Sequence, residues 1–144
     1  MTGFASVDAL FSLDPIISGI EQKYGAKVIA DRLSANYIFD NFPAAASSVN
    51  SDYAMKNSET VNKVVKALAR GIDFVRANPE QTSEILAKYT NLPIEIAKTM
   101  EPVKYAKLDE IDTDGLQKTC DYIKAITWLN LEKSLDADKL IWKQ

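Results

Sequence analysis

The chain has 144 residues, of which 47% are apolar, a size and composition typical of one globular domain. Its 17 basic and 20 acidic residues are interleaved along the sequence and give a net charge of −3. This argues against nucleic-acid binding, which needs basic residues gathered on one face. Histidine is absent and Cys120 is the single cysteine, which excludes Ser-His-Asp and Cys-His sites, histidine-ligated zinc and an internal disulfide. We expect no metal and no cofactor.

The first segment predicts a strand, a helix and a second strand. "SVDALFSL" (6–13) is a short apolar run of strand length, and "AKVIADRL" (26–33) is another. Between them, Asp14 is expected to be the N-cap of a helix with Pro15 in its first turn, and Gly25 is expected to end it. This order fits part of an α/β layer.

An irregular stretch follows. Residues 34–43 have no clear period and predict a loop with three aromatic side chains, Tyr37, Phe39 and Phe42. Small residues in "AAASSVNS" (44–51) predict a strand or an extended connector.

The rest of the chain has the period of amphipathic helices. We expect helices at 58–78, capped by Ser58, at 79–90 and from 93 to 100, each of the first two ended by Asn-Pro or Asn-Leu-Pro. The apolar stripe of the first contains Val61, Val64, Leu68, Ile72 and Val75. A fourth helix begins at Asp112 or Thr113, and its inner positions are Leu116, Cys120, Ile123 and Thr127. Trp128 and Trp142 are expected to be packing residues.

No apolar run reaches the roughly 18–20 residues of a membrane span. The first residues lack the basic region and the cleavage site of a signal peptide, and the chain has no lipid-anchor pattern. We therefore expect a chain with no membrane span and no export signal of its own.

In this order the elements resemble the C-terminal half of ABC-transporter solute-binding proteins of the nitrate/sulfonate/taurine type, which include thiamine-pyrimidine binders. The resemblance is carried by "VDALFSLDPIISGIE", by "SSVNSDYAMKN" and by the helix with "ANPEQTSEILAKYT". It implies an α/β class, mostly helical in this chain, with a partial type II periplasmic-binding-protein fold. Residues 1–43 would end the inserted second lobe, 44–57 would be the hinge strand, and 58–144 would be the helical part that packs on the first lobe.

The same resemblance implies a function. The chain would bind a small solute, such as a sulfonate, nitrate or a pyrimidine precursor, by hinge closure, and would deliver it to an ABC permease outside the cytoplasm. Candidate ligand-binding residues are Ser12, Asp14, Tyr37, Ser47, Ser48 and Asn50. Competing structural roles are Asp14 as a helix cap, Tyr37 as a loop anchor, and Ser47, Ser48 and Asn50 as small residues of a crossover.

Two alternatives remain open. Strands without neighbours have unpaired edges, so the chain could be a non-catalytic assembly domain that forms a homodimer to complete its sheet. The family shape also includes a thiamine-pyrimidine synthase that consumes a histidine and uses pyridoxal phosphate, and the lack of histidine here argues against that enzyme.

Overall fold

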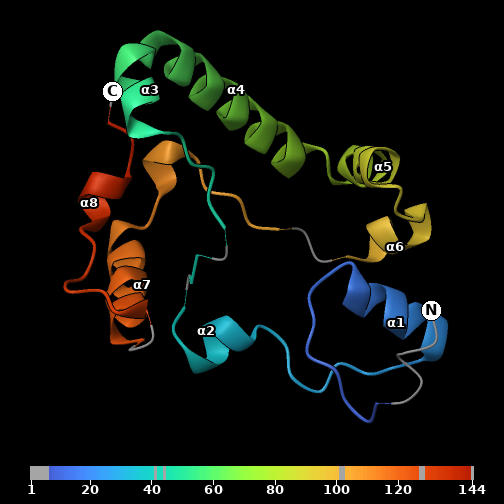
Figure 1. Cartoon of the computed structure of the whole chain (residues 1–144). Helices are drawn as coiled ribbons and strands as arrows, with labels where there is room; N and C mark the ends of the chain where they lie inside the picture. Colours follow the sequence, from blue (N-terminus) through green and yellow to red (C-terminus); the bar gives the residue numbers. More distant parts are fainter. Residues whose placement is uncertain (1–6, 41, 44, 101–102, 127–128, 144) are drawn as a thin grey trace. The chain divides into compact units, whose positions relative to one another are not determined.

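The computed structural model describes residues 7–40, 42–43, 45–100, 103–126 and 129–143, and all the regular elements in these ranges are helices (Figure 1). They are α1 (Ile16–Tyr24), α2 (Leu33–Tyr37), α3 (Ser51–Lys56), α4 (Ser58–Ala77), α5 (Pro79–Thr90), α6 (Ile94–Thr99), η2 (Leu108–Glu110), α7 (Thr113–Ala125) and α8 (Ala137–Leu140). The chain divides into two compact units. Unit 1 is Met1–Ile29 with Ala77–Val103, and unit 2 is Ala30–Arg76 with Lys104–Gln144.

The mostly helical class is confirmed, but the predicted strands are not found. Residues 7–13, 26–32 and 45–50 are non-helical segments without strand pairing, and residues 6 and 44 of these predictions lie outside the described residues. A strand requires a neighbour that pairs with its N–H and C=O groups. The described part of the chain supplies no such neighbour, so the apolar runs remain single segments.

The predicted loop at 34–43 is also corrected, because α2 occupies its first half. Asn36 stabilises this short helix: its backbone N–H donates to the Arg32 carbonyl at 2.9 Å, and its side-chain amide donates to the Asp31 carbonyl at 2.9 Å. A prediction based on hydrophobic periodicity does not detect these local hydrogen bonds. Phe39 and Phe42 pack on each other with ring centroids 5.4 Å apart.

In unit 1, α1 packs against α6. Gly19 lies at this contact, where a Cβ would be at an ordinary van der Waals distance of 3.7 Å from the Ile96 Cδ1 atom. As predicted, α1 ends at Gly25, whose φ of 67° is left-handed and whose N–H donates to the Glu21 carbonyl. The turn between α5 and α6 uses Asn91, also left-handed with φ 55°.

In unit 2, α4 confirms the long predicted helix, with its start shifted by one position. The Val61 N–H donates to the Asn57 carbonyl at 3.1 Å, so Asn57 rather than Ser58 is the flanking residue. Its apolar stripe is only partly covered. Val61 is 7% exposed, whereas Val64 is 52% exposed and Leu68 is 49% exposed.

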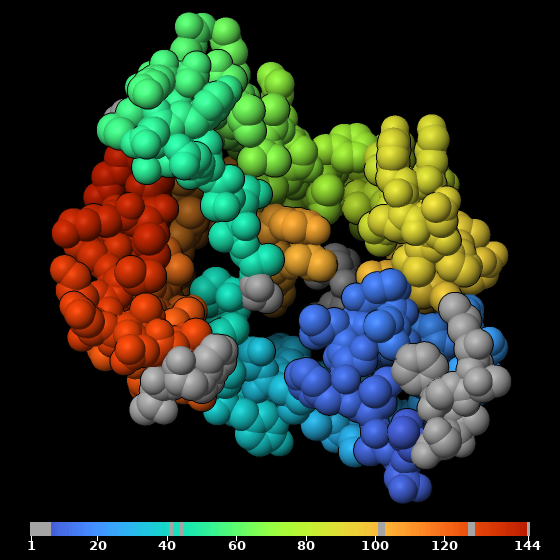
Figure 2. Space-filling view, in the orientation of Figure 1, coloured from blue at the N-terminus to red at the C-terminus, as the bar shows by residue number. Residues whose placement is uncertain are grey.

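Helices α7 and α8 pack together in unit 2, where their atoms form a continuous surface (Figure 2, orange to red). Asp112 is the N-cap of α7, as predicted: its Oδ1 accepts from the Gly115 N–H at 2.9 Å. Cys120 is buried at 4% exposure, which confirms its prediction as a small core residue. Thr127 and Trp128 lie outside the described residues. Trp142 is half-buried and donates from Nε1 to the Oδ1 atom of Asn62 on α4 at 2.8 Å.

Four charged side chains fasten residues 105–110 to the C-terminal end of α4, and we call them the α4 charge cluster: Asp73, Arg76, Lys107 and Glu110. Arg76 donates two hydrogen bonds to the Glu110 carboxylate, at 2.9 and 2.6 Å, and a third to the Tyr105 carbonyl at 2.6 Å. Lys107 Nζ lies 2.5 Å from Asp73 Oδ1.

The cluster predicts a pH dependence of stability. The hydrogen bonds from Arg76 and from the Lys107 N–H lower the pKa of Glu110 from 4.5 to about 2. Because the folded state favours the charged carboxylate, its contribution is complete above about pH 4.5 and is lost as the pH falls towards 2. In urea titrations, the difference in free energy of unfolding between wild type and Glu110→Gln should shrink across that interval. Parallel pH profiles for the two proteins would contradict the pKa shift.

Candidate functional site

The six predicted ligand-binding residues are divided between the units. Ser12 and Asp14 belong to unit 1, and the other four belong to unit 2: Tyr37, Ser47, Ser48 and Asn50. Within unit 2, three of these lie close together in the non-helical segment before α3, and Tyr37 is the last residue of α2. No unit alone contains the full predicted set.

Asp14 accepts hydrogen bonds from the first turn of α1, but the N-cap position is taken by Pro15, one residue later than predicted. The Asp14 Oδ1 atom accepts from the Ser18 N–H at 3.1 Å and from the Ser18 hydroxyl at 2.7 Å, and Ser18 is buried at 9% exposure. Pro15 precedes the first helical residue, Ile16, and therefore does not occupy the first turn as predicted. Both bonds use the same carboxylate oxygen, Oδ1, so neither of them uses Oδ2.

Asn50 is also a helix cap, which sequence reasoning missed. Its backbone is extended with ψ 131°, and its Oδ1 atom accepts from the Tyr53 N–H at 3.0 Å at the start of α3. Asparagine is among the preferred N-cap residues, and Asp52 in the following turn strengthens the signal. The pattern "NSDYAMK" therefore contained the helix start.

The remaining candidates are open to solvent in different degrees. Ser47 and Ser48 are exposed, and Ser12 is half-buried. Tyr37 is 76% exposed, which does not support its alternative role as an anchor within unit 2. Hydroxyl groups in such positions can donate to or accept from a solute without first breaking a buried hydrogen bond.

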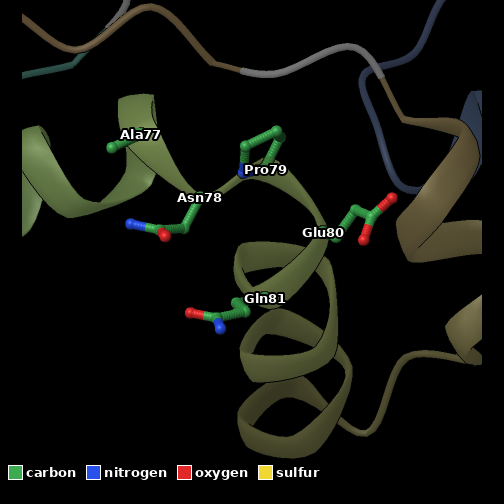
Figure 3. A pocket seen from close by; sticks show the side chains of 5 residues that line it. All are labelled: Ala77, Asn78, Pro79, Glu80 and Gln81. Atoms are coloured by element: carbon green, nitrogen blue, oxygen red, sulfur yellow. The ribbon is translucent and has the colours of Figure 1, made fainter.

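Two surface depressions occur in the described part of unit 1. One, of about 350 Å³, is lined by Ser18, Glu21, Gln22 and Thr99 of α1 and α6. The other, of about 310 Å³, is lined by residues 77–81 at the start of α5. In Figure 3, the Glu80 side chain points away from those of Asn78 and Gln81, so these groups do not converge on one point.

Neither depression suits an anion. Each is lined by one glutamate, Glu21 or Glu80, and by no lysine or arginine. The Thr99 hydroxyl already donates to the Ile96 carbonyl at 3.0 Å. A bound anion would meet a like charge in both places, which is unfavourable at short range.

The described residues contain no group of three or more His, Cys, Asp or Glu side chains placed to hold a metal ion. Within the same residues, none of the helices has the length and apolar content required to cross a bilayer.

Comparison with known families identifies the class of protein. The sequence profile described as NMT1/THI5 like matches residues 5–82, which is more than half of the chain. The chain therefore belongs to the NMT1/THI5-like family, a family of solute-binding proteins of the nitrate/sulfonate/taurine ABC type, as the resemblance predicted. No curated protein and no solved structure matches it. The matched residues extend from the segment before α1 into α5 and include all six predicted ligand-binding positions.

Proposed function

We propose that the chain is the solute-binding component of an ABC importer for a small solute, with a sulfonate, nitrate or a pyrimidine precursor as the candidate classes. One observation carries this proposal: the family match covers residues 5–82, the part that contains every predicted ligand contact. The family is typically periplasmic, which supports a location outside the cytoplasm and a permease as the partner. We propose a binding role without catalysis.

The candidate residues favour one kind of solute within these classes. Ser12, which lies in unit 1 with Asp14, provides a hydroxyl group that can donate to an oxygen of a sulfonate. Asp14 is negative and would pair with a cationic group on the same molecule. An aminosulfonate, which has both groups, therefore fits these residues better than nitrate, which has only the negative one. Capture would proceed by hinge closure, as the family resemblance implies.

The proposal is tested by uptake in cells. Disruption of the gene should abolish uptake of one labelled solute among taurine, nitrate and a pyrimidine precursor, and the intact gene should restore it. Unchanged uptake of all three solutes would overturn the importer role.

Two substitutions of Asp14 distinguish a capping role from a solute-binding role. Asp14→Ala removes the acceptor for Ser18 and should lower the free energy of unfolding by about 1 kcal/mol, measured by urea denaturation. Asp14→Asn keeps an oxygen acceptor and removes the charge, so its cost should be a few tenths of a kcal/mol. In the uptake assay, however, Asp14→Asn should transport an aminosulfonate poorly. Normal uptake by that variant would show that Asp14 only caps α1.

An assembly domain is the second candidate, because one apolar segment is open to solvent. In residues 7–13, Phe11 is 75% exposed and Leu13 is 74% exposed, and the segment has no partner strand in the described residues. Pairing of this segment in a homodimer would cover both side chains. Light scattering distinguishes the two functions: a dimer without solute uptake favours assembly, and a monomer at high concentration argues against it.

An enzymatic role is the third candidate, since the family also includes synthase-like members. The chain contains no histidine, the residue that the synthase consumes. A Schiff-base absorbance band after addition of pyridoxal phosphate would favour the enzyme over the binding protein.

A further inference from the structure

The depression between α1 and α6 lies within unit 1, because every described residue that lines it belongs to that unit. It is held by the packing of α1 against α6, where Gly19 lies beside Ile96. Its volume of about 350 Å³ is at the lower end of the range for small-molecule sites. Its lining contains none of the six predicted ligand-binding residues and consists of Ser18, Glu21, Gln22 and Thr99.

The two hydroxyl groups in this lining have already used their hydrogens. The Ser18 hydroxyl donates to Asp14 Oδ1 at 2.7 Å, and the Thr99 hydroxyl donates to the Ile96 carbonyl at 3.0 Å. A hydroxyl group has one hydrogen to donate and two lone pairs that accept. Towards a ligand, Ser18 and Thr99 can therefore act only as acceptors while these bonds persist.

The charges around the depression have the same preference. Glu21 contributes a carboxylate, which only accepts hydrogen bonds when ionised, and Asp14 adds a second carboxylate one hydrogen bond behind Ser18. Among the described residues that line the depression there is no lysine or arginine. Lys23, the neighbour of Gln22, has its Nζ atom 5.3 Å from the centroid of the Tyr24 ring and is not part of the lining. The ligand that suits this lining is therefore a cation that donates hydrogen bonds.

We propose that the depression between α1 and α6 binds a small organic cation through a primary ammonium group. The three N–H donors of that group match the oxygen acceptors of Ser18, Glu21 and Thr99, and its charge is opposite to that of Glu21. A quaternary ammonium ion has the charge without the donors, and an alcohol has a donor without the charge. The site lies apart from the candidate solute contacts, so it stands or falls independently of the transport function.

Four matched probes test the chemistry of the site on the wild-type chain. They are n-butylammonium, n-butyltrimethylammonium, n-butanol and butyrate, titrated at neutral pH and constant ionic strength while two-dimensional ¹H–¹⁵N NMR follows the backbone amides. We expect n-butylammonium to shift the amides of residues 18–22 and 99 with a saturable, millimolar Kd. The quaternary ion, the alcohol and the carboxylate should each bind at least about tenfold more weakly, the scale of a lost charge-assisted hydrogen bond.

A pair of glutamate variants locates the site. Glu21→Gln removes the charge at nearly constant shape and should weaken n-butylammonium binding by about fivefold, the upper scale for an exposed ion pair. Glu80→Gln makes the same change at the other depression of unit 1 and should leave the Kd unchanged. Equal binding of the quaternary ion would overturn the proposal, because the acceptors would then have no role. The absence of saturable shifts with n-butylammonium would also overturn it, as would an unchanged Kd in Glu21→Gln.

Discussion

Replacement of Val61 by alanine is expected to lower the free energy of unfolding by about 2 kcal/mol, because two buried methyl groups are removed and a small cavity remains. Val61 is 7% exposed in the first turn of α4. The same substitution at Val64, one turn further along, removes methyl groups from a side chain that is 52% exposed. It should cost less than about 0.5 kcal/mol.

The two variants form an internal control, since they share residue type, helix and change in helix propensity. Urea denaturation followed by circular dichroism measures both. A large loss at Val64, equal to that at Val61, would show that the exposed half of the stripe is covered in solution, and light scattering on the same sample would then identify a second copy as the cover.

Helices with strong start and stop signals at their ends could be predicted from the sequence. Asn78-Pro79 ends α4 and starts α5, because the residue before proline is driven from the helical region while proline suits the first helical turn. Asp112 marks the start of α7 for a similarly local reason, an oxygen that accepts from an N–H three residues later. Such signals depend on neighbours in the chain, so they are preserved whatever surrounds the helix.

The strands could not be predicted with the same method. An apolar run such as residues 7–13 has the length of a buried strand, but strand formation depends on a pairing segment far away in the sequence. In the described residues that partner is absent, and Phe11 and Leu13 remain exposed. Residues 26–33 were misread for the same reason, with the additional effect that local hydrogen bonds around Asn36 favour a helical turn at their end.

The predicted site residues show a second limit of sequence reasoning. Asp14 and Asn50 are polar residues beside apolar runs, a pattern shared by ligand contacts and helix caps. The capping bonds are local and were in part foreseeable, whereas contact with a solute depends on several segments together. The division of the six residues between two units is a property of the folded chain alone.

The α4 charge cluster was not foreseeable, because its pairs join residues 34 positions apart in two amphipathic or irregular segments. In the sequence, Asp73 and Arg76 look like ordinary solvated charges on a helix. Only the fold brings them next to residues 105–110 within unit 2.

Trp142 is expected to be the strongest contact between the C-terminal segment and α4. Its indole is half-buried, and Nε1 donates to Asn62 across 80 residues of sequence at 2.8 Å. Trp142→Ala should lower the free energy of unfolding by about 3 kcal/mol through lost packing. Trp142→Phe keeps most of the ring and loses the donor, so it should cost about 1 kcal/mol.

A double-mutant cycle with Asn62→Ala isolates the hydrogen bond, because Asn62→Ala alone leaves the indole N–H without its acceptor and the double variant with Trp142→Phe removes both groups. The interaction energy should be about 1 kcal/mol. Tyr37→Ala, at a side chain that is 76% exposed, is the aromatic control and should change stability by less than about 0.5 kcal/mol. If the effects of the two substitutions in the cycle are additive, the C-terminal segment is held by packing of the ring. If Trp142→Ala has a negligible effect on the free energy of unfolding, this segment does not stabilise the protein through its contact with α4.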